Sequence, residues 1–393
     1  MNRITPITNS EWSTWAECNH EWLLRYGLGL RPVSVARPMR DGKAWHRIKE
    51  VAYKARDFGA GQAEIGSILK AERDLYERSE LAMMDPLAPA ISARTVDEIT
   101  DLGRMLEHAL TVHESRFKAE GMAWDRFGHL EEAMTVPVVT PTGRNSPVLR
   151  WAGRLDGSVR GSGEIWVVET KLTDKSPDKW ILSHGYLPQV TGYAILLGPR
   201  VRERVAGVCF QVAKNAVPVT VADYKVNKDG TLAKRLPANA DAATFTEAAK
   251  ATVDAGAKWA PWYNDTLSQL IDRPVVWESW HWVRFGPGEL DRARAEMYYR
   301  SILIRRMRRI TGARYAWIKG HAVEGSDGLI PPADMVHDVL SDLGPRFPRS
   351  EQACYKWGRP CAYMDVCRFA SAESLSTMRV ATDWHEELEG DDQ

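Results

Sequence analysis

The stretch that decides the fold is Gly153-Arg154-Leu155-Asp156-Gly157, followed by Val167-Val168-Glu169-Thr170-Lys171. Both segments read as strands, and a Gly-Ser-Gly turn between them predicts a hairpin. Residues two apart on a strand point to the same face, so Glu169 and Lys171 project together. If the two strands pair through the turn, Asp156 meets Glu169 at one point.

Two carboxylates beside a lysine suit a hard cation such as Mg²⁺, which prefers oxygen ligands. Such a cation activates water and neutralises charge on a phosphoryl group, while the lysine orients the nucleophile or stabilises developing negative charge. The plainer interpretation is a solvated strand face, because a Glu-x-Lys pair alone is common. Both interpretations stay open on these residues.

The segments around this hairpin alternate between helical and strand patterns. Apolar periodicity and turn residues predict strands at 134–140, 148–159, 164–172 and 205–212, and helices at 41–58, 96–120, 188–197, 241–258 and 289–311. The order helix, three strands, helix, strand predicts a mixed α/β core.

Composition narrows the class of protein. The chain has 393 residues, of which 44% are hydrophobic, so a sizeable core is expected. No apolar run approaches the roughly 20 residues needed to span a membrane, and the first residues lack an apolar signal core, which predicts a cytoplasmic protein. With 52 basic and 52 acidic side chains, any polyanion must be held by a local patch.

Two helical pairs complete a pattern of four motifs. Gly42-Lys-Ala-Trp-His46 lies on the helix before the hairpin, and Gln189-Val-Thr-Gly-Tyr193 lies on the helix after it. Together the motifs resemble the RecB-like branch of the PD-(D/E)XK nuclease superfamily, whose order is G-x-x-x-H, G-x-x-D, D/E-x-K and Q-x-x-x-Y. Leu155 stands where the superfamily's name has proline.

The resemblance implies a restriction-endonuclease-like core, with a central mixed sheet flanked by helices. It also assigns roles: Mg²⁺ or Mn²⁺ would be bound by His46, Asp156, Glu169 and the backbone carbonyl of Thr170. Lys171 would act on the attacking water. Gln189 and Tyr193 would shape the site and contact the DNA strand.

The implied activity is that of a metal-dependent deoxyribonuclease, mainly an exonuclease acting on single-stranded DNA or resected DNA ends. The implied setting is recombination, repair or replication in a bacterium or its phage. By analogy with the family, a helicase, recombinase or single-strand-binding protein would be a partner.

Three cysteines gather near the C-terminal end of the chain. Cys354, Cys361 and Cys367 lie close together amid glycine and proline, which suits a metal-binding loop that takes its fourth ligand from elsewhere. Cys18 is the candidate, because Cys209 lies in an apolar strand and reads as core. This matches an iron–sulfur branch of the same nucleases, similar to CRISPR adaptation exonucleases and the AddB nuclease domain. One cysteine before the core and three after it hold a [4Fe–4S] cluster there; this chain's wider Cys354–Cys361 spacing leaves zinc and incidental thiols as alternatives.

A basic run lies further along the chain, with no acid between Arg300 and Tyr315. Its arginines are predicted to contact a phosphate backbone, and the alternative is a solvated helix face. The residues proposed for DNA binding are Arg305, Arg306, Arg308 and Arg309.

The predicted organisation is one large α/β nuclease domain with a helical insertion and a cysteine clamp joining its ends. The expected parts are an N-terminal segment 1–40, a nuclease core 41–215, a mainly helical extension 216–345, a cysteine cluster 346–370 and an acidic, disordered tail 371–393. Two rival functions remain: a catalytically silent DNA-binding module of the same fold, and a zinc-clamped interaction protein.

Overall fold

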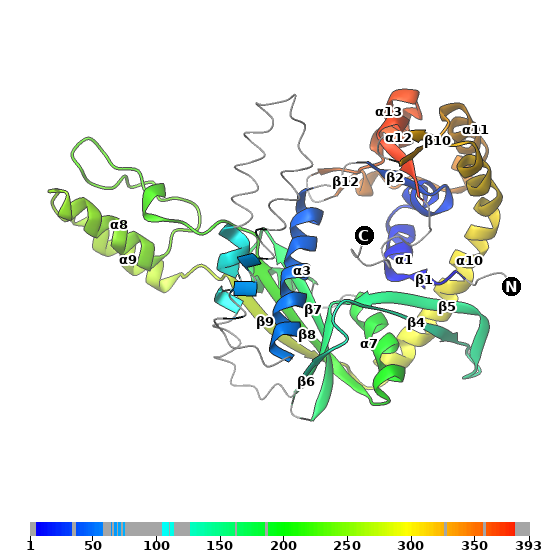
Figure 1. Cartoon of the computed structure of the whole chain (residues 1–393), viewed down its shortest axis with the longest axis horizontal. Coiled ribbons are helices and arrows are strands. Elements are labelled where there is room, and N and C mark those ends of the chain that lie inside the picture. Colours follow the sequence, from blue (N-terminus) through cyan, green and yellow to red (C-terminus); the bar gives the residue numbers. More distant parts are fainter. Residues whose placement is uncertain are drawn as a thin grey trace.

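The computed structural model of the chain describes residues 5–33, 37–57, 104–109, 111–113, 126–161, 163–184, 188–325, 328–356 and 359–381, together with Glu64, Ser67, Ile68, Lys70, Ala71 and Asp74. Within these residues the chain forms a central sheet, a helical region built from both ends of the sequence, and a projecting arm (Figure 1). The mixed α/β class predicted from the sequence is confirmed.

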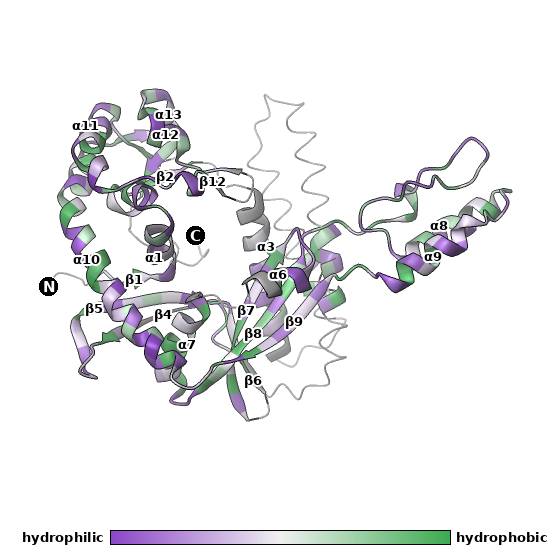
Figure 2. Cartoon of the chain, turned by 180° about the vertical axis from the view of Figure 1, so that it is seen from behind, coloured by the Kyte–Doolittle hydropathy of each residue, from purple (hydrophilic) through white to green (hydrophobic). Residues whose placement is uncertain are grey.

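The central sheet has the strand order β3-β6-β7-β8-β9. Its strands are β3 (Arg126–Gly128), β6 (Gly157–Gly161), β7 (Glu164–Thr173), β8 (Val205–Lys214) and β9 (Glu278–Arg284). Only β7 and β8 pair in parallel; the other pairs are antiparallel. Strand β8 is buried along nearly its whole length and stands out as hydrophobic (Figure 2), because both of its faces are covered.

Two helices cover opposite faces of this sheet. Helix α3 (Arg37–Asp57) packs on the face that carries Leu172 and Ala213. Helix α7 (Pro188–Val201) packs on the other face, which carries Phe210 and Val212. Helix α6 (Pro177–His184) lies between β7 and α7 in the chain. Glu169 and Lys171 on β7 therefore lie in a sheet that is held between two helical layers.

A second sheet contains β1 (Ile7–Thr8), β4 (Glu132–Val139) and β5 (Asn145–Leu155), in the order β1-β5-β4. The prediction of one continuous strand over 148–159 was wrong. The strand ends at Leu155, and after Asp156 the chain enters β6 of the central sheet. Asp156 therefore marks the place where the chain leaves one sheet for the other.

The two ends of the chain pack together. The N-terminal elements are α1 (Asn9–Glu17), α2 (Asn19–Trp22), a π-helical turn η1 (Leu23–Gly27) and β2 (Leu30–Pro32). The C-terminal elements are α10 (Glu289–His321), β10 (Val323–Gly325), β11 (Gly328–Ile330), α11 (Ala333–Leu343), η3 (Gly344–Arg346), η4 (Glu351–Ala353), β12 (Tyr355–Lys356), β13 (Arg359–Pro360), α12 (Met364–Phe369), α13 (Ala372–Ser376) and β14 (Met378–Val380). Strand β14 pairs with β2, and the Trp22 ring stacks on Phe347 with centroids 5.9 Å apart.

The arm lies between β8 and β9 in the chain. It contains η2 (Val221–Asp223), α8 (Ala242–Asp254) and α9 (Trp262–Asp272), and it projects away from the sheet (Figure 1). The stretch predicted as one helical extension, 216–345, thus contains the arm, strand β9 and the long helix α10.

Other predicted boundaries differ from the structure. Helix α7 continues past Gly198 and Pro199 to Val201, because the Arg202 N–H still donates to the Gly198 carbonyl at 2.9 Å. Helix α10 extends ten residues beyond Thr311, to His321. Part of the predicted disordered tail is ordered, since Met378 and Val380 are buried in β14.

Two predictions fall partly outside the residues that the structure describes. Of the helix predicted over 96–120, residues 104–109 and 111–113 are helical and the rest lie outside the described residues, as do 382–393. Among the described helices, none is long and apolar enough to cross a membrane.

Candidate active site

The strand register brings Asp156 and Glu169 together. In the β6–β7 pair, Gly157 lies opposite Val168, so the preceding residue Asp156 lies beside Glu169. The Asp156 carboxylate accepts a hydrogen bond from the Thr170 N–H at 2.7 Å. The hairpin predicted from the sequence therefore forms. It fixes the Asp156 side chain to the backbone of β7.

Glu169 is completely buried, and its carboxylate forms an ion pair with Lys171. Lys171 Nζ lies 2.5 Å from Glu169 Oε1, and Glu169 Oε2 has no hydrogen-bond partner among the described residues. Burial raises the pKa of Glu169 to about 7; the Asp156 charge adds to this effect and the Lys171 ammonium opposes it. A buried carboxylate oxygen without a partner is costly, so this arrangement favours an additional cation.

Lys171 remains charged at neutral pH. Burial alone lowers its pKa, but the carboxylates of Glu169 and Asp156 outweigh burial and raise the pKa above its ordinary value. About a quarter of its side chain still reaches solvent. Lys171 is therefore a fixed positive charge at the mouth of the site.

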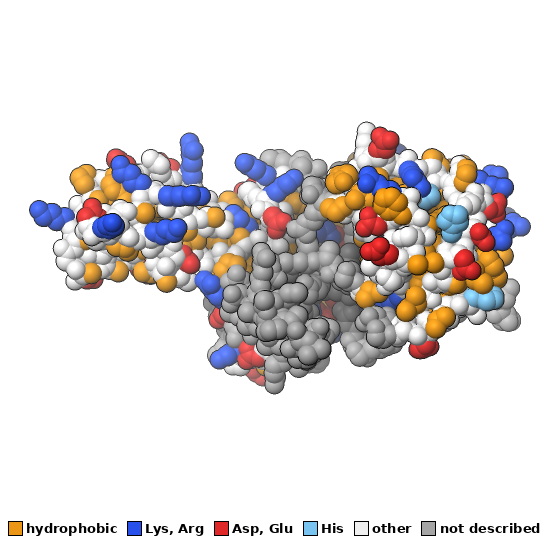
Figure 3. Space-filling view, turned by 90° about the horizontal axis from the view of Figure 1, so that it is seen from above, with side chains coloured by type: hydrophobic (Ala, Val, Ile, Leu, Met, Phe, Trp, Pro, Cys, Tyr) orange, Lys and Arg blue, Asp and Glu red, His pale blue; other side chains and the backbone are white. Residues whose placement is uncertain are grey.

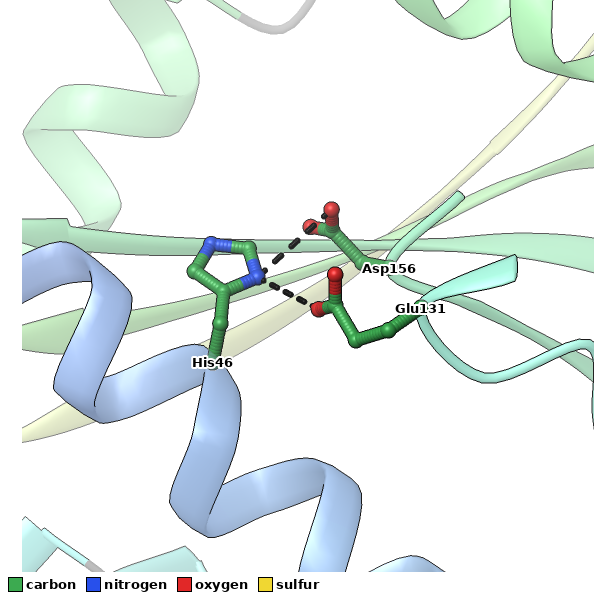
Figure 4. Close-up of side chains that lie close together, drawn as sticks. All are labelled: His46, Glu131 and Asp156. Carbon is green, nitrogen blue, oxygen red and sulfur yellow. Dashed lines mark hydrogen bonds and ion pairs between the residues drawn. The ribbon is translucent and has the colours of Figure 1, made fainter. Parts of the chain in front are cut away.

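His46 reaches the carboxylates from α3 (Figure 4). Its Nδ1 lies 2.9 Å from Glu131 Oε1 and 3.6 Å from Asp156 Oδ1. Burial lowers the pKa of His46, but these two carboxylates outweigh it and raise the pKa above its ordinary value. The negative charges of Glu131 and Asp156 hold the His46 ring on the side of α3 that faces the sheet.

Glu131 was missed by the sequence analysis. It immediately precedes β4, where Glu132 lies opposite Leu155, and this register places Glu131 beside Asp156. Its backbone is held at a positive φ of 47°, which non-glycine residues rarely adopt. No motif marks Glu131, so only the β4–β5 register could have revealed it.

Gln189 and Tyr193 share a face of α7 beside the carboxylates. Gln189 Nε2 donates to the Tyr193 hydroxyl at 2.5 Å. Burial, followed by the charges of Glu169 and Asp156, raises the pKa of Tyr193 well above its ordinary value, so the hydroxyl stays protonated. Gly153 explains the close approach: a Cβ there would lie 2.9 Å from the Leu196 side chain and 3.2 Å from the Tyr193 ring.

The donor set fits a divalent cation. Ligand atoms of His46, Glu131 and Asp156 lie within 4.8 Å of one another, the one such set among the described residues. Glu169 adds a third carboxylate, and the Lys171 ammonium and a protonated His46 partly offset these negative charges. Oxygen-rich sites of this kind bind Mg²⁺ or Mn²⁺.

The sequence profile of the PD-(D/E)XK nuclease superfamily matches residues 6–279, which covers most of the chain and the whole site. The chain belongs to the PD-(D/E)XK nuclease superfamily. Members of this superfamily are generally metal-dependent nucleases, in agreement with the carboxylates and lysine described above. A comparison with curated proteins finds no match.

The PD-(D/E)XK profile does not extend to the second group of predicted ligands, the C-terminal cysteines. Cys18, Cys354, Cys361 and Cys367 all line one pocket, together with Glu21 and Arg349. Burial raises the pKa of Cys361 to about 12, although a hydrogen bond from the Tyr363 N–H lowers it. Cys209 is fully buried in β8, as predicted.

The DNA-binding prediction for this PD-(D/E)XK chain needs one correction. Arg308 is buried and paired with Glu11 of α1: its Nε donates to Glu11 Oε1 at 2.9 Å, and its other nitrogens donate to the carbonyls of Thr5 and Pro6. Arg308 therefore joins α10 to the N-terminal segment and cannot contact a phosphate. Arg305, Arg306 and Arg309, by contrast, are exposed on α10.

Proposed function

We propose that this chain is a deoxyribonuclease that hydrolyses phosphodiester bonds from DNA ends, single-stranded or resected, with Mg²⁺ or Mn²⁺ as cofactor. The observation that carries the proposal is the buried Glu169 carboxylate beside Asp156, with an oxygen that no donor among the described residues satisfies. A silent binding module would have no need for a buried, electrostatically strained carboxylate next to a charged lysine.

Each residue has a role that follows from its position. Asp156, Glu169 and His46 would hold the cation, with the Thr170 carbonyl as a further ligand, and Glu131 either joins them or holds the His46 ring. A bound Mg²⁺ or Mn²⁺ would supply Lewis-acid charge and lower the pKa of a bound water. Gln189 and Tyr193 present a fixed polar pair toward the DNA strand.

Lys171 acts through its charge. Its raised pKa keeps it an ammonium at neutral pH, so it orients the attacking water and stabilises negative charge on the phosphoryl oxygens. In the reaction the water oxygen bonds to phosphorus, the bond from phosphorus to the leaving oxygen breaks, and the leaving oxygen takes up a proton.

The cysteine pocket is proposed to hold a [4Fe–4S] cluster that joins the two ends of the chain. The convergence of all four predicted cysteines on one pocket supports this role. Four thiolates around zinc, with Zn–S bonds of about 2.3 Å, would lie about 3.8 Å apart. Among the described residues no three of these sulfurs lie within 4.8 Å of one another, so zinc would require them to move closer together.

The proposed biological setting is DNA recombination, repair or replication in the cytoplasm of a bacterium or during phage infection. A helicase, recombinase or single-strand-binding protein would supply the resected ends. Exposed Arg305, Arg306 and Arg309 on α10 are proposed to contact the DNA backbone.

A cleavage assay tests the proposal. Purified protein is incubated with end-labelled linear DNA, single-stranded and duplex, and with a covalently closed single-stranded circle, in Mg²⁺, Mn²⁺ or a chelator. We expect metal-dependent degradation of linear DNA and a stable circle. Absence of cleavage with either metal would refute the nuclease, and equal loss of the circle would refute action from an end.

A further inference from the structure

The arm replaces what could be a tight turn. Strands β8 and β9 are antiparallel neighbours with Ala213 opposite Glu278, and the Lys214 N–H donates to the Trp277 carbonyl at 2.8 Å. Strands paired in this way can be joined by a two-residue turn. The residues between Lys214 and Trp277 are therefore not needed to close the sheet.

The arm has its own hydrophobic core. Phe245, Tyr263 and Leu232 are buried in a cluster separate from that of the sheet. The Leu232 N–H donates to the Tyr263 hydroxyl at 2.7 Å, and Asp241 caps α8. At its base, Arg104 donates to the Pro218 carbonyl at 3.2 Å. The arm is thus a folded unit with a fixed attachment.

One side of the arm is basic. The segment Lys225–Arg235 folds back on itself through hydrogen bonds from the Asn227 N–H to the Thr231 carbonyl and from the Ala233 N–H to the Lys225 carbonyl, both 2.7 Å. We call it the basic hairpin, because its exposed charged side chains are Lys225, Lys228, Lys234, Arg235 and a single acid, Asp229.

The basic hairpin's cations are not neutralised. Asp229 accepts hydrogen bonds from Thr231 within the turn, and the four cations form no ion pair among the described residues. Of the arm's other exposed acids, Asp223 in η2 lies 4.0 Å from Arg104, and Glu247 and Asp254 lie on α8. Seen from above, where the hairpin lies over the helices, lysine and arginine side chains outnumber acids along the arm (Figure 3).

The arm also begins close to the catalytic lysine. The Asn215 N–H donates to the carbonyl of Thr173, two residues beyond Lys171 on β7. At about 3.3 Å per strand residue, the base of the arm lies roughly 7 Å along the strand from Lys171. DNA bound at the site and DNA bound by the arm can therefore belong to one molecule.

We propose that the basic hairpin contacts the phosphate backbone of the DNA substrate at a distance from the bond being cut. The inference rests on the proposed nuclease function and adds a second contact surface to it. Unpaired cations on a rigid support give sequence-independent phosphate contacts that position DNA. The arm then raises affinity for long DNA and leaves hydrolysis of short oligonucleotides unchanged.

A pair of double variants tests the surface. Lys234→Glu with Arg235→Glu changes the basic hairpin, and Lys250→Glu with Arg273→Glu changes the same charge on α8 and at the end of α9. DNA affinity is measured against salt, in Ca²⁺, for a long and a short oligonucleotide. For long DNA we expect the hairpin variant to lose about two units of log–log salt slope, with the control variant unchanged. Unchanged slopes, or equal losses in both variants, would overturn the proposal.

Replacing residues 215–276 by Asn-Gly provides a second variant, since this turn suits the β8–β9 register. This variant should cleave a short oligonucleotide within about threefold of the wild-type rate. It should no longer bind long DNA more tightly than the short oligonucleotide. Retention of tighter binding to long DNA would refute the role of the arm. If the wild type cleaves no DNA yet the hairpin variant still loses salt slope, the nuclease function fails and the contact surface stands.

Discussion

The carboxylate site and the cysteine pocket differ in the charge that their potential ligands carry before a metal binds. At the first, the carboxylates of Glu131, Asp156 and Glu169 are brought together by strand register with few compensating charges. At the second, thiols from both ends of the chain meet in a pocket where burial raises the pKa of Cys361 and keeps it neutral. The carboxylate site is strained until a cation binds, whereas the pocket must lose protons before a metal binds. The difference predicts that damage at one site abolishes chemistry and damage at the other loosens the fold.

The largest expected effect is loss of cleavage at the carboxylate site. Asp156→Ala, Glu169→Ala and Lys171→Ala should each lower the cleavage rate by on the order of 10³-fold or more, because each removes a metal ligand or the fixed cation. Circular dichroism and DNA binding should stay near wild type. Glu203→Ala, an exposed acid of the same domain, serves as control. Normal activity in any of the three would refute the assignment.

The second effect distinguishes the cysteines that line the pocket from Cys209, which lies in the core. If the pocket holds the proposed cluster, anaerobically purified protein should be brown, and Cys18→Ser and Cys361→Ser should lose this colour and lower stability by several kcal/mol, since the cluster would close a long loop. Cys209→Ser, in the buried strand β8, should keep its colour. Iron and sulfide analysis with thermal unfolding provides the measurement. Colour that disappears with Cys209 instead of Cys18 would show that the pocket binds no cluster.

The third effect concerns the residue that no motif revealed. Glu131→Gln should weaken Mn²⁺ binding about tenfold or more, because Glu131 either binds the ion or holds His46. Glu132→Gln is the matched control, because the Glu132 side chain instead pairs with His129 and Arg200 at the surface. Equal affinities of the two variants would mean that Glu131 has no part in the metal site.

The fourth effect is a pH dependence of metal affinity. Glu169 has a raised pKa of about 7, so below that pH a proton occupies the carboxylate and competes with the ion. Mn²⁺ affinity should rise with pH, by about tenfold per unit for each proton released, and level off above neutrality. Calorimetry in buffers of different ionisation enthalpy counts the protons released. A flat profile from pH 5.5 to 7.5 would show that no ligand is protonated in the free site.

The two regions also differ in what the sequence could predict. The arrangement of Asp156, Glu169 and Lys171 was predictable for two reasons. Side chains alternate between the two faces of a strand, and the hairpin fixes which residues of β6 and β7 lie opposite each other. Glu131 was not predictable, because its approach to Asp156 depends on the register of a different strand pair. Likewise the break at Asp156 depends on the packing of two sheets, and the buried pairing of Arg308 with Glu11 joins residues far apart in sequence.

The smallest expected effect concerns α10, which packs against α7, β4 and β5 and against η1 of the N-terminal segment (Figure 1). Arg306→Glu with Arg309→Glu should lower the log–log salt slope of DNA binding by about two units and leave the rate at saturating DNA unchanged, because neither side chain touches the carboxylate site. Arg292→Glu with Arg294→Glu, nearer the start of the same helix, controls for overall charge. Arg308→Ala should behave differently, lowering thermal stability by leaving buried Glu11 without its partner. An unchanged salt slope in the Arg306 and Arg309 variant would mean that this face of α10 is only solvated and that the DNA path lies elsewhere.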